Sequence, residues 1–172
     1  MKTTGRKSKK EMTLHDLLIL KLRALYDVEH QLVKALPKMV KHATDPELKK
    51  DFSDHLTETK NQVKRLEECF SNVGERATKT KVEAIRGLIE DAEWLFTHVT
   101  PPEALDAALI AAASYVENYE MAGYRAAIGW AKKMNHESVA VLLTITLEEE
   151  VNADEKLFTL ADSKLNNRAY PL

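Results

Sequence analysis

The sequence has little cysteine, glycine or proline, and each scarcity excludes a class of protein. A single cysteine, Cys69, rules out an internal disulfide framework and any metal site built from several cysteines. Five glycines and five prolines in 172 residues disfavour turn-rich β-sandwiches and barrels. Ala, Leu, Glu and Lys dominate instead, and these residues favour helices. The composition predicts an all-α protein, with Cys69 packed in its core.

The chain also lacks long apolar runs and a strong charge of one sign. No run approaches the roughly 18 residues needed to span a bilayer, and the first dozen residues lack the apolar segment of a secretory signal. We therefore expect a cytoplasmic protein with no membrane partner. A net charge of -2 gives no basic field for nucleic acid, which is not expected as a partner. Residues 1–12 carry five Lys or Arg and predict a disordered basic arm, for which a DNA contact stays the weaker alternative.

Apolar residues spaced by three and four positions predict long helices in a single domain, residues 13–166, followed by a tail at 167–172. The expected helices cover about 13–42, 45–74, 100–134 and 136–166, with a shorter one at 82–96. Thr13 is a good cap for the first helix, and Pro37 is expected to kink that helix without ending it. Thr100 and Glu103 have the spacing of a capping box at the start of the third long helix.

The link between the second and third long helices is too long for a tight turn. About 25 residues separate them, whereas the other links are short. This connection is typical of bundles with one long crossover. The sequence therefore predicts a ferritin-like four-helix bundle of two antiparallel hairpins, with a crossover that carries a short extra helix.

Acidic side chains interrupt the apolar stripes of the long helices near their middle. In the first helix, Glu29 stands between Leu25 and Leu32, where the spacing predicts an apolar residue. An isolated ionised carboxylate is costly to bury unless it is paired or bound to a metal. The third and fourth helices show the same interruption, and the second carries a polar strip. The complete set is Glu29, His55, Glu58, Gln62, Glu117, Glu120, Glu150 and Asp154.

The positions of the acids in the two hairpins favour a single site. Glu29 and Glu58 lie equally far from the bend expected at residues 43–44, and Glu120 and Glu150 lie equally far from Asn135. In an antiparallel hairpin, residues equidistant from the bend lie at the same height. All four helices are therefore expected to bring polar side chains to one level, where they hold two divalent cations.

The sequence leaves the role of His55 open: it is either a metal ligand or a hydrogen-bonded core histidine. Basic residues such as Arg65 are expected beside the apolar stripe, where they do not pair with its carboxylates. The acids expected on solvated faces are Glu67, Glu68, Glu148 and Glu149.

Motifs on all four long helices resemble the YciE/YciF family of bacterial ferritin-like proteins, over about residues 13–165. They are Leu25–Leu32 (LYDVEHQL), His55–Thr59 (HLTET) with Gln62 and Arg65–Glu67 (RLE), Val116–Glu120 (VENYE), and Thr146–Glu150 (TLEEE) with Asp154. The resemblance implies a di-metal centre, a homodimer and an association with bacterial stress responses. It also implies a carboxylate core of Glu29, Glu58, Glu120 and Glu150, with Glu117, Asp154, Gln62 and His55 as a supplementary set.

The sequence departs from the wider ferritin-like pattern, which has Glu-x-x-His on two helices. Asn61 and Ala153 stand three residues after Glu58 and Glu150, where that pattern has histidine. The resulting oxygen-rich ligand set favours iron or manganese over zinc or copper. The departure weakens the case for ferroxidase-type oxygen chemistry.

The leading functional hypothesis is a protein that binds two iron ions, or manganese, and acts on oxygen or peroxide in a bacterial stress response. No catalytic residue is assigned. The alternative is a non-catalytic helical dimer that serves as a stress-related interaction protein with a vestigial or structural metal site. Four tyrosines near the level of the acids are either hydrogen-bond donors, electron carriers or packing residues, namely Tyr26, Tyr115, Tyr119 and Tyr124.

Overall fold

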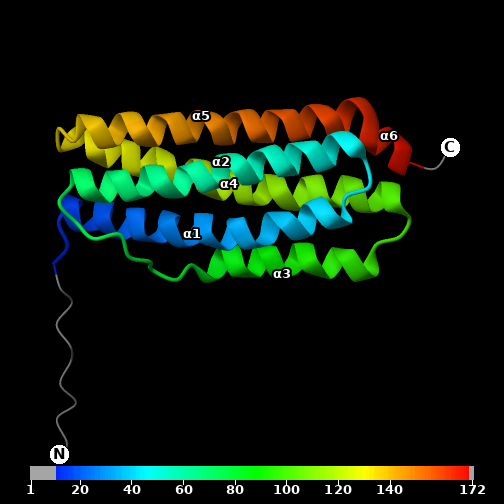
Figure 1. Cartoon of the computed structure of the whole chain (residues 1–172), viewed down its shortest axis with the longest axis horizontal. Helices are drawn as coiled ribbons and strands as arrows, with labels where there is room; N and C mark the ends of the chain where they lie inside the picture. The colour runs from blue at the N-terminus through cyan, green and yellow to red at the C-terminus, as the bar shows by residue number, and fades with distance from the viewer. Residues whose placement is uncertain (1–10, 171–172) are drawn as a thin grey trace, which may run out of the picture.

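Four long helices run along one common axis, and a shorter helix lies against them (Figure 1). The computed structural model describes residues 11–170. The long helices are α1 (Leu14–His42), α2 (Pro46–Asn72), α4 (Pro102–Lys133) and α5 (Glu137–Leu160), and the shorter one is α3 (Glu83–His98). The π-helix η1 (Ala161–Leu165) and α6 (Asn166–Ala169) extend α5. No strand occurs in this part of the chain, so the all-α prediction is confirmed.

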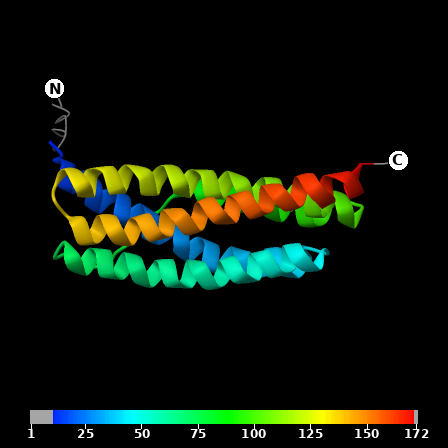
Figure 2. The same cartoon turned by 90° about the horizontal axis from the view of Figure 1, so that it is seen from above.

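The long helices form two antiparallel hairpins, α1 with α2 and α4 with α5. The crossover that carries α3 runs the length of the bundle, so that α2 and α4 point in the same direction (Figure 1). Seen from above, α5 lies between α2 and α4 and packs on both (Figure 2). The predicted bundle of two hairpins with a long crossover is confirmed.

The helix starts show which predicted caps form. The Thr13 hydroxyl accepts a hydrogen bond from the Asp16 backbone N–H, and the Asp16 carboxylate accepts one from the Thr13 backbone, which completes a capping box. Asp45 caps α2 in a similar way through two backbone N–H groups. The capping box predicted at Thr100 is wrong, because α4 begins after Pro101 and has no side-chain cap. Proline has no backbone N–H, so this cap position cannot take part in the reciprocal bond.

The apolar core is divided into two clusters that lie on either side of a polar level. One cluster contains Leu36 and Phe52, and the other contains Leu22 and Phe70. Cys69 belongs to the second cluster and is fully buried, as predicted. On each long helix, buried polar residues stand between the residues of the two clusters. The polar level is therefore closed by packed apolar side chains at both ends.

Helix α3 is attached to α1 at both ends. The Asp27 carboxylate accepts a hydrogen bond of 2.9 Å from the Val82 backbone N–H, just before α3 begins. Further along, Lys38 and Glu93 form an ion pair of 2.5 Å. The helix packs on α4 as well as on α1, so that it covers the groove between those two helices.

The C-terminal helices return to the bend between α1 and α2. Lys164 and Arg168 each form an ion pair of 2.8 Å with Asp45. The tail predicted from residue 167 thus includes part of α6, while residues 171 and 172 and nearly all of the predicted basic arm lie outside the described residues. Among residues 11–170, no helix has the length and apolar character needed to cross a bilayer.

Candidate metal centre

Five ionisable side chains are buried together at the polar level, and they come from all four long helices. Glu29 lies on α1, His55 on α2, Glu117 and Glu120 on α4, and Glu150 on α5. Three of them, Glu29, Glu120 and Glu150, are 0% exposed, whereas Glu117 and His55 keep 3% and 6%. Each occupies the inward stripe of its helix, where the helical period otherwise places leucine, valine or alanine.

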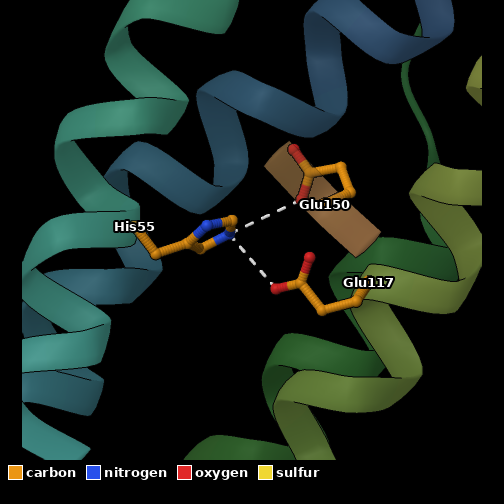
Figure 3. A group of neighbouring side chains, drawn as sticks. All are labelled: His55, Glu117 and Glu150. Carbon is orange, nitrogen blue, oxygen red and sulfur yellow. Dashed lines mark ion pairs between the residues drawn. The ribbon is translucent and has the colours of Figure 1, made fainter. Parts of the chain in front are cut away.

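These side chains form two adjacent groups that share one residue. His55, Glu117 and Glu150 make up one group, and Glu29, Glu120 and Glu150 make up the other. Within each group, one potential ligand atom per residue lies within 4.8 Å of the others. Figure 3 shows the first group, in which the His55 Nε2 atom lies 3.1 Å from Glu117 Oε1 and 3.8 Å from Glu150 Oε2. Two groups joined by a common carboxylate have the arrangement that a pair of neighbouring cations requires.

Several buried atoms at this level have no hydrogen-bond partner within the described residues. They are Glu29 Oε2, Glu117 Oε2, Glu150 Oε2, both carboxylate oxygens of Glu120, Gln62 Oε1 and His55 Nδ1. Buried polar atoms are normally paired, and each unpaired one costs roughly 1–3 kcal/mol. All but the imidazole nitrogen are oxygens that accept and do not donate when the carboxylates are ionised. The carboxylate oxygens therefore fit cations, which would satisfy several of them together.

Two hydrogen bonds orient the carboxylates. The fully buried Tyr124 hydroxyl donates to Glu29 Oε1. The Gln62 amide donates to Glu150 Oε1 at 2.5 Å and to Glu149 Oε2 at 3.0 Å. The bonds to Glu29 and Glu150 each use one oxygen of the buried carboxylate and leave its second oxygen without a hydrogen-bond partner among the described residues. Bonds of this kind hold ligands in position around a metal site.

Glu149 is not on a fully solvated face, contrary to the sequence-based expectation. Arg65 makes two hydrogen bonds of 2.8 and 2.9 Å to the Glu149 carboxylate and a third of 2.6 Å to the Thr146 hydroxyl. Arg65 thus pairs with an acid beside the buried stripe, and Gln62 connects this pair to Glu150. In the sequence, the three-residue spacing of Gln62 and Arg65 indicates that both lie on one face of α2. Predicting their contact with Glu149 also requires the rotation of α5 about its axis, which the sequence does not give.

The carboxylates raise one another's proton affinity. Burial raises the pKa of Glu29 to about 7, even though the Tyr124 hydrogen bond opposes the rise. Burial, together with the charges of its neighbours, raises the pKa of Glu120 well above the usual value. The pKa of Glu150 is raised well above its usual value by burial and by the Glu117 charge. Close carboxylates share protons unless a cation neutralises them.

His55 and Glu117 behave as an ion pair. Burial opposes a positive charge on His55, but the carboxylate of Glu117 prevails and raises the pKa of His55 well above its usual value. Burial likewise opposes ionisation of Glu117, yet the adjacent imidazolium lowers the pKa of that carboxyl. A histidine that binds a metal must first lose its proton, so metal binding at this group would be coupled to proton release.

The remaining residues of the predicted set lie at the edge of the two groups. Glu58 Oε2 is 3.5 Å from His55 Nδ1, and its side chain is 35% exposed. Asp154 accepts a hydrogen bond of 2.5 Å from Ser114. Gln62 is fully buried and contacts the site through Glu150. The structure therefore brings Glu29, His55, Glu117, Glu120 and Glu150 together and puts these three residues around them.

Three of the four tyrosines named from the sequence have different surroundings. Tyr124 is buried and bonded to Glu29, whereas Tyr115 is 65% exposed. Tyr26 donates its hydrogen bond to Glu67, on the outer side of α2. Only Tyr124 among these three contacts a carboxylate of the two groups.

The fold and the buried groups define a helical bundle with a candidate site for two cations. The chain belongs to the family described as domain of unknown function DUF892, whose model matches residues 13–170. It is 36% identical to the protein YciF of Escherichia coli strain K12 over 158 residues, which are 91% of this chain and 95% of the relative. The resemblance inferred from the sequence is thereby confirmed.

Solved structures of similar proteins have the same fold. The crystal structure of the E. coli stress protein YciF matches with a TM-score of 0.87 at 36% identity, over 91% of this chain and 99% of that one. YcfI of Rhodopseudomonas palustris matches with a TM-score of 0.86 at 38% identity, over 90% of this chain and 98% of that one. A protein of Xanthomonas campestris shares the fold at 18% identity, with a TM-score of 0.70 over 88% and 92% of the two chains.

Proposed function

We propose that this protein is a ferritin-like di-metal carboxylate protein that binds two iron ions, or manganese, and acts on oxygen or peroxide in a bacterial stress response. The observation that carries the proposal is the pair of buried groups that share Glu150. Five carboxylate oxygens of these groups, at least one from each glutamate, have no hydrogen-bond partner among the described residues. Cations are the simplest partners for so many buried acceptors.

The two groups suggest which residues would hold each ion. His55, Glu117 and Glu150 would hold one, and Glu29, Glu120 and Glu150 the other. Carboxylates with a single imidazole suit iron or manganese better than softer metals. The supplementary residues at the edge are Glu58, Gln62 and Asp154. When bound, a pair of iron(II) ions would supply the two electrons that reduce dioxygen to hydrogen peroxide. This reduction consumes two protons.

The protein's own contribution is to orient the ligands and to exclude bulk water. Tyr124 and Gln62 hold one oxygen each of Glu29 and Glu150. The two apolar clusters close the site along the bundle axis. Protons leave His55 and the neighbouring carboxyls when cations replace them. A small oxidant is consistent with such an enclosed site.

The similarity to a protein described as a stress protein supports the cellular role. The proposal includes a cytoplasmic location, which is the expectation from the sequence, and a homodimeric assembly, which the family resemblance implies.

The test is anaerobic titration with iron(II) of protein purified without a metal-affinity tag. The parent should bind close to two ions per chain. Glu29→Gln, Glu120→Gln and Glu150→Gln remove a charge with little change of shape, and each should lower the occupancy. Glu150→Gln should have the largest effect, because this carboxylate belongs to both groups.

A matched control is Glu148→Gln, which lies beside the site in sequence but has an exposed side chain. Glu67 is less suitable because it accepts the Tyr26 hydrogen bond. If the three site variants bind iron(II) as the parent does, the carboxylates form a structural network. The protein would then be better described as a helical interaction protein.

A further inference from the structure

An apolar cavity lies beneath α3 and ends at the candidate site. It lies between α1, α3 and α4, and its wall is mainly apolar, with Leu36, Ala92 and Val116, while Lys38 and Glu93 also line it. At its inner end it is lined by His55 and Glu117. Its volume is about 40 Å³, whereas a single buried water needs roughly 10–15 Å³. The cavity can hold a molecule of a few atoms and nothing much larger.

A second cavity is also lined by His55 and Glu117, but more charged residues stand in its wall. It has a volume of about 30 Å³ and lies between α2, α4 and α5. Its wall carries Asp51, Asp54, Glu58 and Lys156. Charged walls of this kind stay hydrated, so this cavity suits ions and polar molecules.

The residues of the two groups that keep some exposure are the ones that line both cavities. Glu29, Glu120 and Glu150 are 0% exposed, and the remaining exposure belongs to His55 and Glu117. Glu117 also carries a buried oxygen, Oε2, that has no hydrogen-bond partner among the described residues. Any molecule that reaches the site must therefore approach it at this edge.

We propose that the apolar cavity beneath α3 is the entry path for dioxygen, and that cations and peroxide reach the same edge through the charged cavity. Dioxygen is small, uncharged and apolar, so it partitions into a dry apolar cavity that disfavours ions and hydrogen peroxide. The Lys38–Glu93 ion pair holds helix α3 over the cavity, at its rim. This inference rests on the proposed function, because it assigns a substrate path to that site.

The first measurement needs no metal and no activity. Xenon is an apolar probe that enters dry cavities, and crystals of the apo protein under xenon pressure should show it beneath α3. Ala92→Leu fills the cavity from α3 and should abolish this binding. Ala84→Leu adds the same side chain at an exposed position of the same helix, and it should leave xenon binding unchanged.

The second measurement compares two oxidants by stopped flow, with iron(II) bound anaerobically beforehand. Ala92→Leu should slow oxidation by dioxygen severalfold, and leave oxidation by hydrogen peroxide and the two-iron stoichiometry unchanged. Leu88→Ala, which enlarges the cavity, should increase xenon occupancy and speed the dioxygen reaction relative to the peroxide reaction. Leu88→Ala carries the test if Ala92→Leu does not fold.

The outcomes separate the path from the proposed function. No xenon beneath α3, or equal changes with both oxidants in the cavity variants, would overturn the entry path. If bound iron(II) in the parent reacts with neither oxidant, the proposed function fails. In that event, xenon binding that Ala92→Leu abolishes would still establish a cavity that admits an apolar gas to the His55–Glu117 edge.

Discussion

Glu29→Gln should change how the stability of the metal-free protein depends on pH. The pKa of Glu29 rises from 4.5 to about 7 on folding, so the folded state holds a proton that the unfolded chain releases. An acid whose folded pKa is raised lowers stability as pH rises from the unfolded pKa to the folded one. The parent should therefore lose stability between about pH 4.5 and 7 through this group and level off above that range.

The size of the effect follows from the same two pKa values. At 1.36 kcal/mol per pH unit, the rise from 4.5 to about 7 corresponds to roughly 3 kcal/mol. Glutamine has no such titration and still accepts the Tyr124 hydrogen bond through its carbonyl oxygen. Relative to the parent, Glu29→Gln should gain roughly 3 kcal/mol of stability between about pH 4.5 and 8.

Urea unfolding followed by circular dichroism, with a chelator present, measures this difference at each pH. Glu148→Gln, at an exposed position, should follow the parent curve throughout. Saturating iron(II) under anaerobic conditions should reverse the decline in the parent, because cations then replace the protons. Parallel parent and Glu29→Gln curves over the whole pH range would refute the claim that Glu29 is a buried carboxylate crowded by its neighbours.

Three further outcomes can be measured. Tyr124→Phe removes the hydrogen bond to ionised Glu29 and should cost roughly 2 kcal/mol in urea unfolding at pH 8; an unchanged midpoint would contradict the contact. Asp45→Ala removes the cap of α2 and two ion pairs and should cost about 2 kcal/mol in the same assay, whereas a loss near zero would mean that the C-terminal helices do not depend on this residue. Light scattering should give twice the chain mass of 19.5 kDa; a cage of many subunits would reject the homodimer and reopen iron storage.

The sequence alone determined the helices and the level of the site. The three- and four-residue spacing of apolar residues is a local property, and it predicted α1, α2 and the crossover helix α3 within a few residues of their bounds. The same spacing put Glu29, Glu120 and Glu150 on inward stripes, and all three are fully buried. Equal distances from the bend predicted that Glu120 lies level with Glu150, and Glu29 level with Glu58, because the rise per residue along a helix is constant.

Only the tertiary structure decided how each helix is rotated about its axis. His55 and Glu58 are three residues apart on α2, so both lie near the inward face, yet His55 is buried and the Glu58 side chain is 35% exposed. The position of α5 also made Glu150 the residue shared by both groups and placed Glu149 against Arg65. Helical period gives the angle between residues on one helix, but the packing of all four helices sets which angle faces the interior.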